Sequence, residues 1–194
     1  ALAADLDRRG ALLVSIAAGI TTAHLESWFG ESAAIVRCMP NTPALVGMGA
    51  SGLFANARVT EEQKLLAQGI ISTVGFATWV DADSDIDIVT AVSGSGPAYF
   101  FLFMEAMQAT AKEMGLSEDL ARALTYHTAA GAAALAQYSE DDIATLRRNV
   151  TSPGGTTEQA ILQFEDGDLR GLVAKALKAA RTRSVELAEE TDST

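Results

Sequence analysis

Residues 98–114 constrain the fold more than any other part of this chain. They are typical of one helix that ends at Gly115, yet the segment YFFLFMEAMQATA has as polar side chains only Glu105, Gln108 and Thr110. A helix that is apolar nearly all round must be buried on every side. A domain of about a hundred residues can hardly bury it alone, so we expect a second subunit to cover this helix.

The rest of the second half is also predicted to be helical. Pro97 suits the first turn of the apolar helix, and the preceding SGSG run, 93–96, would shape its start. An acidic stretch at 81–87 is interpreted as a domain boundary, which gives domains 1–82 and 83–194. Further helices are expected over 117–138 with a Ser117 cap, 141–148, 157–165 and 168–190. Within the second helix, the Ala-rich run 129–136 either lets helices approach closely or only reflects helix propensity.

The first half alternates helix and strand patterns. Helices are predicted over 1–9, from a Thr21 or Thr22 cap to Phe29, and over 60–74 with TEEQ as a capping box. Between them lie three apolar segments of strand length, 11–18, 34–39 and 76–80. Strands without polar alternation are typical of a parallel sheet covered on both faces. The expected fold is therefore the C-terminal part of a Rossmann-like parallel α/β domain followed by an all-α domain.

Composition excludes several partners. The chain has 48% hydrophobic residues and a formal net charge of −11, which disfavours binding to nucleic acid or to anionic membranes. No apolar run is expected to be long enough to span a bilayer, and no secretory signal is recognised before the first strand. The single cysteine, Cys38, lies in an apolar segment and is interpreted as a buried structural thiol in a cytoplasmic protein. His24 and His127 have no partners at ligand spacing, so no metal site is expected.

One glycine motif matches a dinucleotide-binding pattern but lacks the expected context. GMGASG at 47–52 fits the G-x-G-x-x-G pattern of dinucleotide-binding loops. That loop must leave a strand and open a helix, whereas LFANARV follows here without an acidic residue about twenty positions on. We interpret ALVGMGASGLFA as two short strands around glycine turns.

The segment NVTSPGGTTE, 149–158, carries the clearest binding signal. Pro153 stiffens the loop, and Gly154 and Gly155 allow a ligand to approach the backbone. Thr156 or Thr157 could cap the following helix, whose first amides would bind a carboxylate or a phosphate. The alternative is an ordinary connection between a loop and a capped helix.

Four motifs in this order resemble the pyrroline-5-carboxylate reductase family. They are VSIAAG at 14–19, RCMPNTPA at 37–44, SGSGPAYFF at 93–101 and NVTSPGGTTE. The resemblance covers essentially the whole chain and implies reduction of 1-pyrroline-5-carboxylate to L-proline, the last step of proline biosynthesis. It also implies a homodimer joined through the helical domain, with further assembly into a decamer. Residue 1 would correspond to a position well inside the family's first domain, beyond its glycine-rich phosphate loop, so this chain alone could fail to hold NADPH.

The resemblance also implies roles for single residues. The substrate carboxylate would be held by Ser152 and by amides around Gly154, Gly155 and Thr156, while Thr157 would be catalytic and bond the ring nitrogen. The nicotinamide of NADPH or NADH would lie against two loops after strands, formed by Ala17, Ala18 and Gly19 and by Met39, Pro40, Asn41 and Thr42.

Two alternatives stay open. One is a dimerisation or ligand-binding module that lacks the cofactor half. The other is a related two-domain hydroxyacid dehydrogenase, a class that typically relies on a catalytic lysine in the helical domain. Lys112 and Lys175 have no such motif around them.

Overall fold

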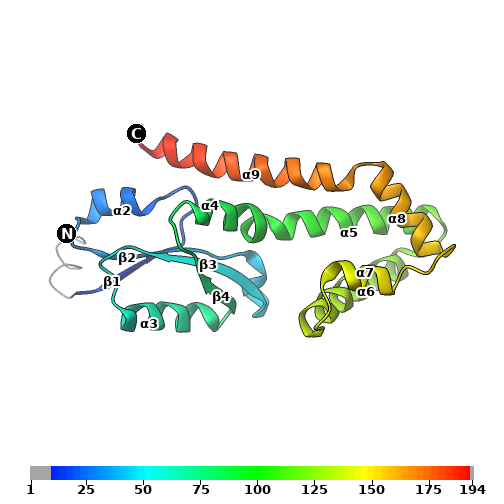
Figure 1. The fold of residues 1–194 in the computed structure, drawn as a ribbon, viewed down its shortest axis with the longest axis horizontal. Helices are drawn as coiled ribbons and strands as arrows, with labels where there is room; N and C mark the ends of the chain where they lie inside the picture. Colours follow the sequence, from blue (N-terminus) through cyan, green and yellow to red (C-terminus); the bar gives the residue numbers. More distant parts are fainter. Residues whose placement is uncertain (1–9, 193–194) are drawn as a thin grey trace. The chain divides into compact units, whose positions relative to one another are not determined.

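A computed structural model describes residues 10–192, and the helix predicted over 1–9 lies outside them. The described chain divides into two compact units. The first contains residues 10–97 and 175–192, and the second contains residues 98–174. The predicted boundary between domains 1–82 and 83–194 stays a prediction. Figure 1 shows the elements along the chain.

A four-stranded sheet lies at the centre of the first unit. Its strands are β1 (Leu12–Ser15), β2 (Ala34–Met39), β3 (Gly49–Ala55) and β4 (Gly75–Trp79), in the order β1-β2-β3-β4. The pairs β1–β2 and β3–β4 are parallel, but β2 and β3 are antiparallel. The sheet is therefore mixed rather than parallel throughout. Only the short 3-10 helix η1 (Thr42–Val46) joins β2 to β3, and a parallel pair needs a longer crossover.

Segment 44–55 thus forms one strand after a 3-10 turn, and our expectation of two short strands there is wrong. Gly47 is the left-handed C-cap of η1 with φ +73°, while Gly49 and Gly52 lie inside β3. None of these glycines follows a strand and opens a helix, which agrees with our interpretation that this motif is not a dinucleotide-binding loop.

Two capped helices cover opposite faces of this sheet (Figure 1). Helix α2 (Thr22–Phe29) begins after Thr21, whose hydroxyl accepts a hydrogen bond from the amide of His24 at 3.2 Å. Helix α3 (Glu61–Ser72) begins with the expected capping box of Thr60 and Gln63. Because side chains alternate along β2, Ile35 packs in one buried cluster and Val36 in the other.

The helix that leaves the sheet starts earlier than predicted. It runs from Asp85 to Glu113 through α4 (Asp85–Val89), a π-helical turn η2 (Thr90–Gly94) and α5 (Gly96–Glu113). The acidic stretch thus enters the helix, and the SGSG run lies inside it rather than at its start. By length and hydropathy alone this helix could cross a membrane, so our expectation that no apolar run is long enough is wrong.

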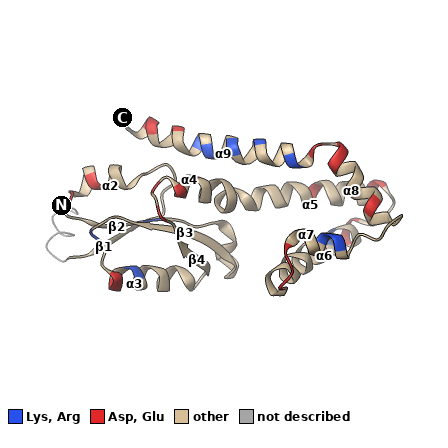
Figure 2. Ribbon diagram, in the orientation of Figure 1, with Lys and Arg blue, Asp and Glu red and all other residues tan. Residues whose placement is uncertain are grey.

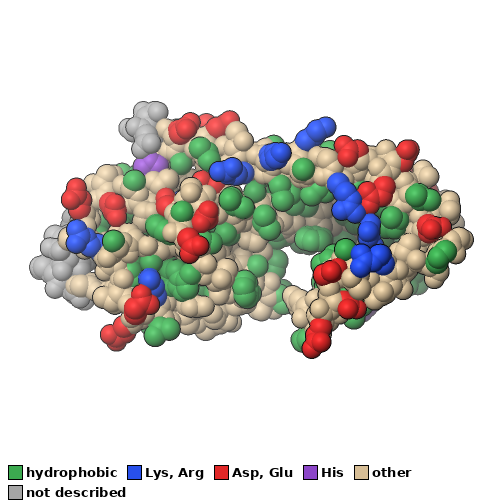
Figure 3. Space-filling model, viewed as in Figure 1, with side chains coloured by type: hydrophobic (Ala, Val, Ile, Leu, Met, Phe, Trp, Pro, Cys, Tyr) green, Lys and Arg blue, Asp and Glu red, His purple; other side chains and the backbone are tan. Residues whose placement is uncertain are grey.

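The second unit is helical, as expected. It contains most of α5, then α6 (Glu118–Tyr138) with its Ser117 cap, α7 (Ile143–Asn149), α8 (Thr156–Asp166) and the start of α9 (Leu169–Asp192). Helix α5 is nearly free of charged residues, in contrast to α9 (Figure 2). Its large apolar side chains stay exposed within the chain, and Figure 3 shows hydrophobic side chains gathered over it. Examples are Phe100 at 67% and Leu102 at 67% exposure.

Candidate functional site

The loop before α8 is tied back onto α7. The Thr151 hydroxyl donates a 2.6 Å hydrogen bond to the carbonyl oxygen of Arg147, and Nδ2 of Asn149 donates to Oδ2 of Asp141 at 3.3 Å. Gly154 has φ +71°, a left-handed conformation that a residue with a Cβ adopts only under strain. The helix then begins with Gly155 at its N-cap, not with the predicted Thr156 or Thr157 cap.

Two of the amides in this loop are already engaged. The Gly155 amide donates to the carbonyl oxygen of Ser152 at 3.0 Å, and the Gly154 amide donates to Oε2 of Glu158 at 2.8 Å. Glu158 is the third helical residue, so its carboxylate also lies at the favourable end of the helix dipole. These bonds preorganise the loop. They also remove Gly154 and Gly155 as the most available donors for a ligand.

The first two helical residues keep their donors available. Within residues 10–192, no hydrogen bond engages the amides of Thr156 and Thr157, and both residues are exposed. Ser152 is exposed beside them. Two free amides at the start of an eleven-residue helix suit a small carboxylate, and the segment Ser152–Thr157 that carries them, here called the amide cradle, also contains three hydroxyl groups.

The predicted cofactor residues lie in the first unit, at one edge of the sheet. Since β1 and β2 are parallel, the loops after their carboxyl ends meet at the same edge. Ala17 and Ala18 are exposed, whereas Gly19 is buried with φ +72°. A Cβ at Gly19 would lie 3.0 Å from Cβ of Leu187, so the last helix also limits this position.

The second of these loops contacts the π-helical turn. Met39, Pro40 and Asn41 are half-buried, and Thr42 is exposed. Nδ2 of Asn41 donates a 3.0 Å hydrogen bond to the carbonyl oxygen of Ser93. Sequence reasoning missed this contact, although the polar SGSG run in an otherwise apolar helix was its visible signal.

A buried ion network in the first unit was also missed. Arg37 in β2 is 2% exposed, and its guanidinium lies 3.2 Å from Oδ2 of Asp83 and 3.5 Å from Oδ1 of Asp87. An arginine inside the apolar strand AIVRCM, with an acidic stretch further on, was the available signal. A buried charge needs such partners, because desolvation penalises it otherwise.

Cys38, the neighbour of Arg37, is buried at 1% exposure. Burial raises the pKa of its thiol to about 11, so the thiol stays protonated at neutral pH. The predicted burial of Cys38 is thus confirmed, and a buried, protonated thiol is a poor nucleophile.

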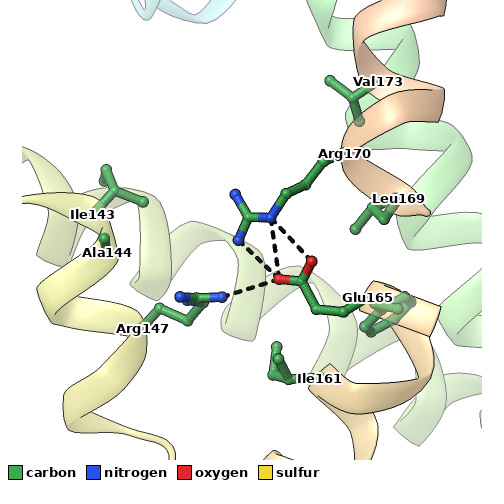
Figure 4. Close-up of a pocket in the computed structure, with 9 residues that line it drawn as sticks. Ile143, Ala144, Arg147, Ile161, Glu165, Leu169, Arg170 and Val173 are labelled. Atoms are coloured by element: carbon green, nitrogen blue, oxygen red, sulfur yellow. Dashed lines mark hydrogen bonds and ion pairs between the residues drawn. The ribbon is translucent and has the colours of Figure 1, made fainter. Parts of the chain in front are cut away.

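A further pocket of about 640 Å³ lies within the second unit, between α7, α8 and the start of α9 (Figure 4). Its charged side chains, two arginines and one glutamate, pair with one another and carry a net charge of +1. Oε1 of Glu165 accepts hydrogen bonds from Arg147 at 3.2 Å and from Arg170 at 2.8 Å. The hydrogen bond from Arg170 is the main reason that the pKa of Glu165 is lowered. The remaining lining residues are apolar, so the polar groups of this pocket are confined to this one ion cluster.

The fold and the amide cradle define the class of protein. A partial Rossmann-type sheet is joined to a helical domain, and residues 83–187 match the family model described as pyrroline-5-carboxylate reductase dimerisation. The chain belongs to the pyrroline-5-carboxylate reductase family, which confirms the resemblance and, apart from the antiparallel β2–β3 pair, the predicted fold class.

Curated relatives and solved structures agree with this assignment. The chain is 56% identical to a pyrroline-5-carboxylate reductase of Pseudomonas aeruginosa over 92% of its own length and 66% of the relative's. It therefore spans about two-thirds of the relative's length. A Coxiella burnetii pyrroline-5-carboxylate reductase structure has a TM-score of 0.93 at 49% identity, covering 96% of this chain and 69% of that one. A Plasmodium falciparum pyrroline carboxylate reductase with NADP bound has a TM-score of 0.87 at 33% identity, covering 93% and 68%.

Proposed function

We propose that the full-length gene product reduces 1-pyrroline-5-carboxylate to L-proline with NADPH or NADH, as the last step of proline biosynthesis in the cytoplasm. The observation that carries the proposal is the preorganised cradle at Ser152–Thr157 in a chain that is 56% identical to a named pyrroline-5-carboxylate reductase. The substrate carries one carboxylate, which matches two free amides and adjacent hydroxyl groups.

The substrate carboxylate is bound by the hydroxyl of Ser152 and by the amides of Thr156 and Thr157. Gly154 and Gly155 support this binding by shaping the loop, because their own amides are engaged. The hydroxyl of Thr157 bonds the ring nitrogen, which gains electron density as the imine is reduced. The described residues of the loop include no cationic general acid, so the nitrogen's proton comes from water or from a substrate bound as iminium.

The sheet edge fits the nicotinamide end of the cofactor. The loops of Ala17–Gly19 and Met39–Thr42 follow two adjacent parallel strands, where open α/β sheets bind ligands. When bound, NADPH or NADH would supply a hydride to the imine carbon. The role of these two loops is to orient the nicotinamide ring, since catalysis of this kind depends mainly on geometry.

The functional form is a homodimer, with a decamer as its further assembly. Support comes from the match to a dimerisation family and from the exposed apolar side chains of α5, which a monomer would leave in water. Light scattering at micromolar concentration tests this part of the proposal. A monomeric mass would contradict it.

The decisive experiment is an assay of the full-length gene product for oxidation of NADPH or NADH in the presence of 1-pyrroline-5-carboxylate. We expect turnover that requires both the cofactor and the substrate. A protein that binds neither and only dimerises would instead support the dimerisation-module alternative. Titrating NADPH into the 194-residue chain then shows whether this part alone retains cofactor affinity.

A further inference from the structure

Asn41 uses both ends of its side-chain amide. Its Oδ1 accepts a 2.9 Å hydrogen bond from the backbone amide of Ala50 in β3, and its Nδ2 donates a 3.0 Å hydrogen bond to the carbonyl oxygen of Ser93. These two partners fix the orientation of the side-chain amide. The N–H group of Ala50 needs an acceptor, which only Oδ1 provides, and the carbonyl oxygen of Ser93 needs a donor, which only Nδ2 provides. One half-buried side chain thus joins the cofactor-side loop, the sheet and the π-helical turn.

The carbonyl group of Ser93 is available because of Pro97. In a regular α-helix the carbonyl of residue 93 accepts from the amide of residue 97, but proline has no N–H group. The proline ring would also clash with that carbonyl. The chain avoids the clash by a π-helical turn, in which the amide of Ser95 donates to the carbonyl oxygen of Thr90 at 2.8 Å. Asn41 then supplies the donor that Pro97 lacks.

A second contact joins the same two segments. A Cβ placed on Gly94 would lie 2.8 Å from Cε of Met39, so the Met39 side chain packs directly against the backbone of the turn. Met39 and Asn41 are both among the proposed cofactor residues. The loop is therefore held at two points by a turn that belongs to the helix leading out of the sheet.

We propose that Asn41 is a positioning residue. Through its hydrogen bond to Ser93 it holds the Met39–Thr42 loop in the position that orients the nicotinamide ring for hydride transfer. This inference rests on the proposed reductase function and extends it. Asn41 acts through the loop and does not bind the cofactor with its own amide, since both ends of that amide are engaged. A displacement of about 1 Å near reacting atoms can lower a rate about a hundredfold.

The test uses Asn41→Asp in the full-length gene product. Aspartate keeps the acceptor for Ala50 but removes the donor to Ser93. We expect kcat with 1-pyrroline-5-carboxylate to fall at least about tenfold, while the Kd for NADPH stays within about threefold. Gln137→Glu makes the same amide-to-carboxylate change on the exposed surface of α6 and serves as the control. A large rise in Kd with an unchanged kcat would show direct cofactor binding by Asn41 and overturn the proposal.

A double variant separates positioning from stability. Pro97→Ala gives the carbonyl of Ser93 a donor within its own helix, so we expect it to restore the Tm of Asn41→Asp. Measured against Pro97→Ala alone, kcat should remain low, because the loop is still untied from the turn. Recovery of kcat together with Tm would reduce Asn41 to a structural role and overturn the inference. An unmutated protein that does not turn over the substrate would overturn the proposed function itself.

Discussion

The hydroxyl of Ser184 in α9 donates a 2.8 Å hydrogen bond to Oδ1 of Asp87 in α4, and the two residues are 97 positions apart. The same carboxylate oxygen lies 3.5 Å from the guanidinium of Arg37. All members of this network belong to the first unit. The network joins β2, α4 and the part of α9 that lies in this unit.

Removing the cation should destabilise this unit strongly. Arg37→Met leaves two carboxylates in a largely buried site without a cation, and we expect a loss of about 3–5 kcal/mol in the free energy of unfolding. Ser184→Ala removes one hydrogen bond to a charged group and should cost about 2 kcal/mol. Urea unfolding measures both, with Ser72→Ala at the exposed end of α3 as the control. Equal midpoints for Arg37→Met and the control would show that the network contributes nothing.

Thr157→Ala tests the assignment of the catalytic hydroxyl. In the full-length gene product, kcat/KM for 1-pyrroline-5-carboxylate should fall about 10²-fold, in line with the loss of one donor to the reacting group. Thr182→Ala, an exposed threonine on α9, is the matched control. An unchanged kcat/KM would remove the proposed role of Thr157.

The buried thiol should make stability depend on alkaline pH. Burial raises the pKa of Cys38 to about 11, from 9.0 for an exposed thiol. Between these values the unfolded chain has released a proton that the folded chain still holds, so the free energy of unfolding falls as the pH rises. We expect this fall in the unmutated protein between pH 9 and pH 11. Urea unfolding of Cys38→Ala should lack this component, because all other titrating groups are shared. Parallel pH profiles would contradict the assignment.

Two glycines should respond in opposite ways to alanine. A Cβ at Gly52 in β3 would lie 2.7 Å from Cγ2 of Val89, and a β-branched side chain cannot turn away easily. Gly52→Ala should therefore cost about 1–3 kcal/mol. Gly69 lies inside α3 with open space around it, so Gly69→Ala should stabilise the protein by about 0.5–1 kcal/mol. Thermal unfolding of both variants checks the pair, and a tolerated Gly52→Ala would show that α4 can move away from the sheet.

Local signals predicted most helices and strands well. Thr21 and Thr60 cap the helices that their sequences indicate, and Ser117 caps α6. The direction of β3 could not be predicted in the same way. A strand's own pattern does not encode which way it runs, and only the short η1 connection forces the reversal.

The start of the long apolar helix was predicted too late, because proline is found at two kinds of helix position. Proline after SGSG is typical of a first helical turn, yet it also occurs inside helices where another group satisfies the freed carbonyl. That group is Asn41, 52 residues before Ser93. Helix and strand periodicities describe only neighbouring residues, so they could not predict a contact between residues this far apart.

The candidate substrate site was found as a segment, but its donors were not resolved. Pro-Gly-Gly followed by threonines indicates a loop that opens a helix, and this is what the structure contains. The sequence did not indicate that Glu158 would bond the Gly154 amide or that Ser152 would accept from Gly155. These bonds depend on the loop's conformation, which only the folded backbone defines.

The first unit combines residues 10–97 with residues 175–192, which lie much later in the sequence. Arg37, Asp83 and Asp87 are synthesised long before Ser184. The ion network of the sheet therefore lacks the hydrogen bond from Ser184 until α9 has been made. Loss of the α9 turn that carries Ser184 would therefore damage a sheet whose strands lie far earlier in the sequence.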